Sequence, residues 1–527
     1  MALTRRGFVA ATALAGATSA LSAALAGPDC PHAQAEPASM VPGGADYLQL
    51  THRGHNRRFV ARPERIHVPS TAEEVRDAVA TAVRDRARIA VRAGGHCFED
   101  FVDSEDTRVL IDLQRLSAVD WDDQHRAFSV GAGADLDAVY RGLAHWGVTV
   151  PGGLCRAVGA GGHISGGGFG PLSRMFGLVV DHLYGVEVVT VDSSGRASVT
   201  LATKDGPNRD LWWGHTGGGG GNFGVVTRFL LRSTSSDGAA PALALPRQPA
   251  AVVVGRLLVP MPMVTEDSFL RLMGNYLDFY SRNRDPGNRF AGLYGRLMLR
   301  RLTESFVDLL ILSHGEAGEA HARLDEFLAA VTEGVTPAPV ILPRAQLDYA
   351  ASIEGYYAQS PVNPSRIKIK SALLRQPYSA DQLRALYRAL VEPVVNIDSF
   401  VEFSPFGGAI NATAPGATAM PGRDSFMKML IHAAWDDPGH DDRFLAWTRA
   451  TYRELYADTG AAPVPNARTG GAYINYPDAD LADPAFNTSA VDWPLFYYGD
   501  GYPRLRRIKS EWDPGNVFRH RLSIQPQ

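Results

Sequence analysis

Apolar positions recur at helical spacing in some parts of the chain, whereas in others they alternate or run together. Thr71 and Glu74 have the spacing of a capping box, and one apolar helical face follows them. That face consists of Val75, Ala78, Val79, Ala82 and Val83. Further helices are expected over 135–146, 268–280 and 316–331, and strands over 89–91, 109–113, 128–131, 225–230, 290–300, 305–312, 367–374, 399–403 and 430–434. This succession of strands, glycine turns and helices predicts an α+β fold rather than an all-β sandwich.

A stretch rich in Ser, Asp, Gly, Ala and Pro at 234–249 separates two patterned regions. With 527 residues the chain is long enough for two domains. We expect a cofactor domain over 46–234 and a substrate domain over 250–470, in which the strands at 290–300 and 305–312 form an antiparallel pair. The aromatic and glycine-rich segment 471–527 is expected to fold back and complete the first domain.

The first 26 residues resemble an export signal rather than part of the fold. Arg5 and Arg6 precede an alanine-rich apolar run, and Ala24-Leu25-Ala26 offers a cleavage site. The arginine pair indicates the twin-arginine route, which carries folded proteins, and a general secretory signal is the alternative. No other stretch is long and apolar enough to span a bilayer, so a soluble exported protein is expected.

Net charge and cysteine content exclude several classes of function. A formal charge of −4 over the whole chain gives no support to nucleic-acid or membrane-surface binding, so small molecules are the expected partners. Three cysteines cannot build a disulfide framework. No His-Glu-x-x-His pattern is present for a metal, and Ser165 lies outside any Gly-x-Ser-x-Gly elbow, so neither a zinc site nor a serine hydrolase is predicted.

Glycine is concentrated in three clusters, over 92–97, 151–170 and 212–227. Backbone N–H groups in such clusters can surround a pyrophosphate without intervening side chains, which favours a nucleotide cofactor. Residues 219–224 formally match the Gly-x-Gly-x-x-Gly fingerprint of nicotinamide-binding domains. That fingerprint must open a helix, whereas the β-branched run 225–230 predicts a strand, so a nicotinamide site is rejected.

Taken together, the three clusters resemble the FAD-linked oxidases of the vanillyl-alcohol oxidase superfamily, specifically the actinobacterial natural-product oxidases of its berberine-bridge-enzyme-like branch. The resemblance covers nearly the whole chain after the signal. It implies a two-domain α+β FAD-binding fold with an antiparallel-sheet substrate domain. It also implies that the FAD is bonded twice, with His96 on the 8α-methyl carbon of the flavin ring and Cys155 on C6. Two such bonds are expected to raise the reduction potential of the flavin.

The same resemblance implies which residues surround the cofactor. Besides His96 and Cys155 they are Arg92, Ala93, Gly94, Gly95, Gly152, Gly153, Gly159, Ala160, Gly161, Gly162, His163, Gly166, Gly167, Gly168, Asn222, Gly224, Val226, Tyr473 and Asn475. Ala160 has the position that governs oxygen access to the flavin in the family, and its small side chain favours an oxidase that forms hydrogen peroxide. A simple packing role for this alanine is the alternative.

The motif Tyr473-Ile474-Asn475-Tyr476 resembles the family's Tyr-x-Asn-Tyr motif, whose second tyrosine deprotonates substrate in several members. This resemblance implies that Tyr476 is the base. On a strand, its side chain would point away from Tyr473 and Asn475, so the two tyrosines are not expected to share one task. A free phenol has a pKa of about 10, so Tyr476 needs help from a cation, a hydrogen bond or the flavin, and the sequence does not identify that helper.

Two phenylalanines stand where many members of the family carry tyrosine. Phe169 and Phe406 are expected to line the substrate pocket and to make it apolar. We therefore expect oxidation of a secondary, and in the sharpest version allylic, alcohol of a secondary metabolite to a ketone, with oxygen reduced to hydrogen peroxide. Oxidation of a sugar, an oligosaccharide or an antibiotic-linked hexose is the alternative, and a non-catalytic flavin-binding protein is the alternative from another class. Nothing in the sequence predicts the oligomeric state.

Overall fold

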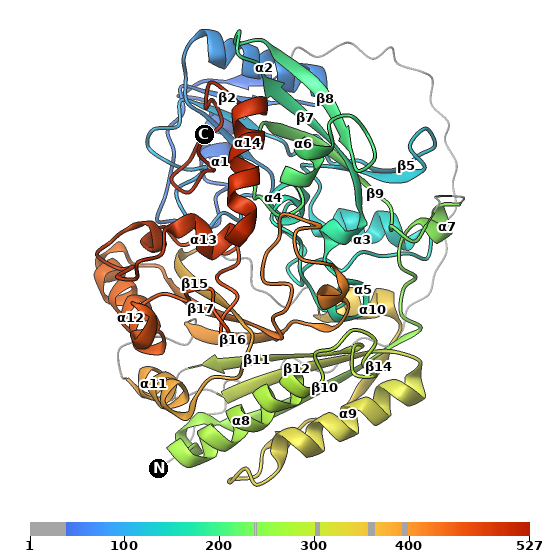
Figure 1. Ribbon diagram of the computed structural model, residues 1–527, viewed down its shortest axis with the longest axis vertical. Helices are drawn as coiled ribbons and strands as arrows, with labels where there is room; N and C mark the ends of the chain where they lie inside the picture. The colour runs from blue at the N-terminus through green and yellow to red at the C-terminus, as the bar shows by residue number, and fades with distance from the viewer. Residues whose placement is uncertain (1–37, 237, 239, 301–305, 357–363, 393–398) are drawn as a thin grey trace. The chain divides into compact units, whose positions relative to one another are not determined.

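The structure is a computed structural model that describes residues 38–527, apart from 237, 239, 301–305, 357–363 and 393–398. From Pro37 onward the chain forms one compact unit, whose helices and strands are drawn in Figure 1. The export signal expected over 1–26 lies outside the described residues, and so does residue 305 of the strand expected over 305–312.

The described chain begins with a small mixed sheet of four strands. Their order is β1 (Ala38–Met40), β2 (Arg65–Val68), β4 (Val109–Asp112) and β3 (Ile89–Arg92). β2 and β3 both pair in parallel with β4, while β1 pairs antiparallel with β2. β2 and β3 flank β4 and run in the same direction, so they need a crossover connection, which the helix α2 (Ala72–Arg84) supplies.

The start of α2 differs in one detail from the expected capping box. Thr71 accepts the backbone N–H of Glu74 at 3.2 Å, as predicted. The Glu74 carboxylate, however, accepts the N–H of Ser70 at 2.6 Å rather than that of Thr71, so the reciprocal bond reaches one residue further back. The apolar face is buried as expected at Val75, Ala78, Val79 and Ala82.

A second sheet has five antiparallel strands. Their order is β5 (Val119–Asp122), β6 (Ala127–Gly131), β9 (Val225–Leu231), β7 (Leu183–Val191) and β8 (Ala197–Thr203). β9 confirms the strand expected after the third glycine cluster, so the glycine run before it does not open a helix. The expected helix α3 (Leu136–Ala144) begins after Asp135, whose side chain accepts the N–H of Ala138 at 2.8 Å.

The third sheet is the largest and is antiparallel throughout, as expected for the region after residue 250. Its order is β13 (Val340–Ile341), β10 (Ala251–Pro260), β12 (Phe306–Gly315), β11 (Leu293–Arg300), β16 (Phe400–Pro405), β17 (Met427–Trp435) and β15 (Arg366–Leu374), with β14 (Ala345–Leu347) also paired to β10. The expected pairing of the strands at 290–300 and 305–312 is confirmed, because Leu293 of β11 pairs with Ser313 of β12.

Helices complete the unit. α8 (Glu266–Arg282) and α9 (Ala317–Thr332), both expected from the sequence, cover one side of the large sheet (Figure 1). α11 (Ala380–Val391) and α12 (Asp441–Leu455) pack against each other, and α12 also packs against β15 and β17. The remaining helices are α1 (Ala45–Thr51), α4 (Ala160–Ser165), α5 (Ser173–Phe176), α6 (Arg209–Gly214), α7 (Pro241–Ala244), α10 (Tyr349–Tyr356), α13 (Trp493–Tyr498) and α14 (Tyr502–Trp512).

The C-terminal segment contacts the third glycine cluster. In α14 the buried Lys509 donates to the carbonyl of Asn222 at 2.6 Å, and the N–H of Ile524 donates to the Asn222 side chain at 2.8 Å. α14 also packs against α6, which immediately precedes that cluster (Figure 1). The exact domain boundaries, at 234, 250 and 471, stay a prediction.

Candidate active site

A cavity of about 610 Å³ lies between the glycine clusters and one face of the large sheet, a size typical of ligand pockets. Most of the expected cofactor residues line it: Arg92, Ala93, Gly94, Gly95, His96, Gly153, Cys155, Gly159, Gly161, Gly162, His163, Asn222, Gly224, Val226, Tyr473 and Asn475. The expected base Tyr476 lies in the same wall. Residues more than 300 positions apart in the sequence therefore meet around one space.

Two glycines bring the first and second clusters together. A Cβ at Gly94 would lie 2.3 Å from the backbone N of Gly159, and a Cβ at Gly159 would lie 2.2 Å from the N of Gly94. No larger residue fits at either position without moving backbone, because real Cβ atoms do not approach so closely. This contact sets the loop that carries His96 against the loop that carries Cys155.

His96 and Cys155 share a neighbour. The backbone of Ala157 hydrogen-bonds both the His96 ring and the Cys155 thiol. Burial lowers the pKa of His96 to about 3, so its imidazole is neutral and keeps a lone pair for bonding. Burial raises the pKa of Cys155, and it raises the pKa of the neighbouring Cys97 to about 12. Of these two thiols, both in the cavity wall, Cys155 is held by hydrogen bonds within the second glycine cluster.

Several features of the cavity fit FAD. The nitrogen Nε2 of His163 and that of His520 are buried in it without a hydrogen-bond partner, so each is free to bond a polar group of a ligand. His520, which no sequence motif marks, stacks on Phe101 with ring centres 4.0 Å apart. The glycine backbone of the clusters leaves room for a pyrophosphate beside these rings. Neutral histidines and bare backbone in a cavity of this size suit a flavin dinucleotide.

Some expected cofactor residues support the site from behind. Gly152, Gly166, Gly167 and Gly168, which were expected to contact the cofactor, do not line the cavity. A Cβ at Gly166 would lie 2.0 Å from the Asn475 side chain, and Gly167 and Gly168 have φ values of +118° and +71°. Glycine is needed at 167 and 168 for the turn, and at 166 for close packing against Asn475.

Ala160 is also placed differently from the expectation. It is fully buried at the start of α4, where its N–H donates to the carbonyl of Ala134 at 2.7 Å, and it does not line the cavity. Val158, two residues earlier, does line it.

Other expected cofactor residues have structural bonds of their own. Arg92 is buried and donates to Asp112 at 2.8 Å, so its charge is compensated within the protein. Asn222 donates to the carbonyl of Gly218 at 2.9 Å and so closes the third glycine cluster. Asn475 donates to the carbonyl of His163 at 2.9 Å, which ties the Tyr476 loop to α4.

Tyr476 lies in a turn, which corrects the expected strand. Its N–H donates to the carbonyl of Tyr473 at 2.8 Å, and the two rings meet edge to face with centres 5.4 Å apart. The tyrosines therefore do not point to opposite sides. Both contact the same cation, since Nζ of Lys428 lies 4.3 Å from the ring centre of Tyr476 and 5.6 Å from that of Tyr473.

Lys428 provides a cation beside Tyr476, which the sequence did not identify. Its Nζ donates to Oη of Tyr476 at 3.0 Å. Burial lowers the pKa of Lys428 to about 8, against a raising effect of Glu402. Burial raises the pKa of Tyr476 well above 10, and Glu402 adds to the rise, while Arg296 acts in the opposite direction. The Lys428 ammonium, which donates to the phenol oxygen, also favours the phenolate. Lys428 lies on β17, opposite Ser404 of β16.

The wall of the cavity that the large sheet forms, here called the sheet wall, is more polar than expected. Tyr294, Arg296, Glu402 and His432 line it together with Lys428. Ser404 donates to Glu402 at 2.7 Å, and the Nε of Arg296 is buried without a hydrogen-bond partner. Such a wall can bond hydroxyl or other polar groups of a ligand.

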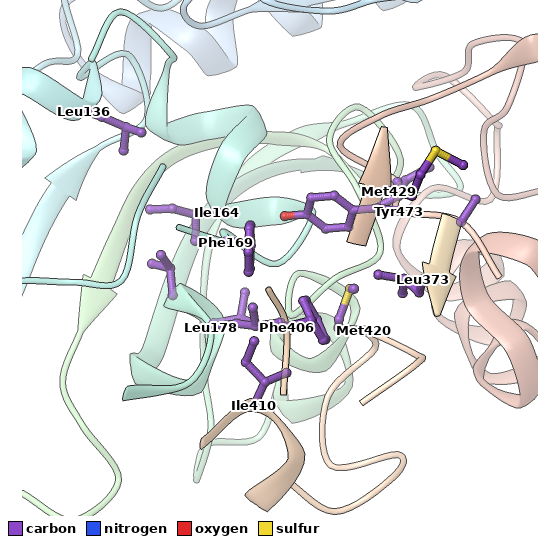
Figure 2. Close-up of a cluster of buried hydrophobic side chains, with 14 of the residues drawn as sticks. Leu136, Ile164, Phe169, Leu178, Leu373, Phe406, Ile410, Met420, Met429 and Tyr473 are labelled. Atoms are coloured by element: carbon purple, nitrogen blue, oxygen red, sulfur yellow. The ribbon is translucent and has the colours of Figure 1, made fainter. Parts of the chain in front are cut away.

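The two phenylalanines have different positions (Figure 2). Phe169 lines the cavity, and Lys428 Nζ lies 4.3 Å from its ring centre. Phe406 does not line it: the ring stacks on Phe169 at 5.4 Å and packs with Ile410 and Met420 in a buried cluster. The expected role of Phe406 in the substrate pocket is therefore corrected to one of packing behind Phe169.

Among the described residues, no group of three or more His, Cys, Asp or Glu side chains could hold a metal ion. Within that same part of the chain, none of the helices combines the length and the apolar character needed to cross a membrane.

Comparison with known proteins agrees with this site. The FAD binding domain family matches residues 63–197, and the berberine and berberine-like family matches residues 472–525, which include Tyr476. The chain belongs to the berberine-bridge-enzyme-like FAD-linked oxidases, and it is an FAD-dependent alcohol oxidase with oxygen as the acceptor.

Particular relatives extend over almost the full length. Aclacinomycin-N/aclacinomycin-A oxidase of Streptomyces galilaeus is 42% identical over 541 residues, covering 99% of this chain and 98% of the relative. The crystal structure of a glycopeptide hexose oxidase complexed with teicoplanin matches with a TM-score of 0.90 at 41% identity, covering 93% of this chain and 99% of that one. The oxidoreductase that catalyses the terminal step of gilvocarcin biosynthesis matches with a TM-score of 0.89 at 36% identity, covering 93% and 100%.

Proposed function

We propose that this chain oxidises an alcohol of a secondary metabolite to a carbonyl compound, on FAD bonded through His96 and Cys155. The observation that carries the proposal is the hydrogen-bonded pair of Tyr476 and Lys428, 3.0 Å apart, in the wall of the cavity that also contains His96 and Cys155. The similar oxidases of aclacinomycin, of a glycopeptide hexose and of gilvocarcin biosynthesis support a substrate of this class.

The loop geometry supports two separate covalent bonds to the flavin. Both residues line the cavity, and backbone groups of the same residue, Ala157, hydrogen-bond both side chains. The neutral imidazole of His96 can act as a nucleophile, and Cys155, hydrogen-bonded to the backbone of the same residue, supplies the second one. Mass and visible absorption of acid-precipitated protein test the proposal: yellow flavin retained on the wild type supports it, and complete release refutes it.

The protein's part in the reaction is to bind the alcohol and take its proton. When bound, FAD supplies the hydride acceptor and, after reaction with oxygen, the route of the electrons to hydrogen peroxide. Tyr476 removes the hydroxyl proton, while the ammonium of Lys428 stabilises the phenolate that accepts it. Tyr473, buried and in edge contact with Tyr476, holds the base in place and keeps water from that side of it.

The polar sheet wall bears on the choice of substrate. An allylic secondary alcohol of a polyketide-like molecule was expected from an apolar pocket, but Arg296, Glu402 and His432 line the side facing Tyr476. These groups favour a ligand that carries several hydroxyls near the reacting carbon, such as a sugar-bearing metabolite. We therefore keep the sugar or antibiotic-linked hexose as the second candidate.

Two probes separate the candidates. Purified enzyme is mixed without oxygen with 2-cyclohexen-1-ol or with cellobiose, and bleaching of the flavin is followed. Reduction by the allylic alcohol supports the first candidate, whereas reduction confined to cellobiose replaces it with the second. The Tyr476→Phe variant should lose reduction by the active probe. Undiminished reduction would remove the base assignment, and a wild type that no alcohol reduces would favour a non-catalytic flavin carrier.

Export through the twin-arginine route belongs to the same proposal. It rests on Arg5 and Arg6 in the first residues of the chain. Replacing both with lysine should retain the full-length protein in the cytoplasm of a host that has this route. Unchanged export would refute the assignment and favour the general secretory route.

A further inference from the structure

A closed cluster of six charged side chains lies beside the active site. Lys368 donates to Glu99 at 2.7 Å and to Asp478 at 2.6 Å, whereas Lys370 donates to Asp478 at 2.7 Å and to Asp480 at 2.9 Å. Arg449 completes the cluster with two bonds of 2.9 Å to Asp480. Both lysines and all three carboxylates are at most 7% exposed.

The cluster joins two loops of the site. Glu99 follows His96 by three residues, in the loop that carries His96. Asp478 follows Tyr476 by two residues, in the loop that carries Tyr476. The N–H of Ala479 also donates to Glu99, at 3.3 Å, so the two loops touch directly. Lys368 contacts both of them.

The position of β15 explains this arrangement. β15 is the edge strand of the large sheet, next to β17. Ile367 and Ile369 pack with Tyr476 on one face, while Lys368 lies between them in sequence and therefore points to the other face. The Tyr476 loop passes around this edge, with the phenol on the cavity side and Asp478 on the ion-pair side.

The free energy of burying six charged side chains favours a positioning role for the cluster over a purely stabilising one. Buried ions require partners, and the six ion-paired side chains carry three positive and three negative charges. Arg58 is a further cation that interacts with Glu99 and Asp480. Buried ion pairs are often no more stabilising than apolar residues of similar volume, so stability alone is a weak reason for six charges. Short bonds in fixed directions do, however, hold two loops at a defined separation.

We propose that Lys368 is a positioning residue that holds the His96 loop and the Tyr476 loop together and so fixes Tyr476 relative to the flavin. This inference rests on the proposed function for its catalytic consequence. Its structural content, a link between two loops made by one lysine, does not depend on the substrate. Lys370 provides the matched comparison, because it bonds Asp478 and Asp480 but not Glu99.

Three variants of the full-length holoprotein test the link: Lys368→Met, Lys370→Met and the double variant Glu99→Gln with Lys368→Met. Lys368→Met leaves one carboxylate in excess, so its melting temperature should fall by several degrees. The double variant restores two positive and two negative charges and should regain most of that loss. Amide hydrogen exchange is measured for residues 97–99 and 473–480, together with flavin retained after acid precipitation.

Lys368→Met and the double variant should exchange faster in both segments, and Lys370→Met only in 473–480. With the probe that reduces wild-type flavin, the double variant should remain roughly 10- to 100-fold slower in flavin reduction although its stability has returned. Recovery of wild-type exchange in the double variant would overturn the proposal, because charge balance alone would then explain the cluster. Failure of every probe with the wild type would count against the proposed function, while the exchange results would still decide the link.

Discussion

Replacement of Lys428 with methionine should slow oxidation at neutral pH and move its pH dependence upward. Lys428 donates to Tyr476 at 3.0 Å, and burial lowers the pKa of the lysine to about 8 while that of the tyrosine is raised well above 10. At low pH the pair carries two protons and cannot take another from the substrate. Loss of one of them leaves a single proton that the two groups share, and the form in which Lys428 keeps it as an ammonium carries the phenolate of Tyr476 as the base.

The size of the effect follows from the two pKa values. In the wild type the first proton leaves with the lysine's pKa of about 8, so the rate should rise with pH and level off above that value. Without the lysine the base is a phenol with a pKa of at least about 10, two units higher, which corresponds to roughly 100-fold less base at pH 7 and about 2.7 kcal/mol. Burial raises the pKa of Tyr476 further, so the phenolate is scarcer still at pH 7.

The assay is single-turnover reduction of the flavin at saturating substrate from about pH 6 to about pH 10, which isolates proton removal from reoxidation. Lys204→Met is the matched control, because the Lys204 ammonium donates to Thr234 at the surface and its loss should leave the profile unchanged. A Lys428→Met enzyme that keeps the wild-type profile, with a rate within about threefold, would refute the assignment of Lys428 as the partner of the base.

Three further predictions concern the attachment of flavin and the packing around it. His96→Ala and Cys155→Ala should each retain flavin after acid precipitation and the double variant should release it; release from either single variant would contradict two attachments. Gly94→Ala should lower the free energy of unfolding by about 1–3 kcal/mol or more, because its Cβ would lie 2.3 Å from backbone of the second loop. Gly274→Ala, in the middle of α8 with nothing within 4 Å, should instead raise it by about 0.8–1 kcal/mol in the same denaturant titration, and equal losses would contradict the contact argument. Phe406→Ala should cost about 3–5 kcal/mol of stability with little change in KM, whereas a large KM change with intact stability would return Phe406 to the pocket.

Much of the fold and of the cofactor site could be predicted because it depends on local chemistry. Helical and strand periodicity identified α2, α8 and α9 and the antiparallel pair β11 and β12. Glycine has a local signature as well, since only this residue tolerates the close contact between Gly94 and Gly159. The three glycine clusters in the sequence therefore predict much of the cavity wall.

Other features depend on contacts between distant segments, which leave no local pattern. Tyr476 and Lys428 are 48 positions apart, and they meet because a turn packs against the inward-facing side of β17. Lys368 reads as an ordinary strand residue, yet an edge strand and two loops bury it among carboxylates. Phe406 looked like a pocket residue until its ring was found behind Phe169. Residue type and spacing determine backbone geometry and the chemistry available, whereas the pKa of each group and its partners depend on burial, which only the packed chain creates.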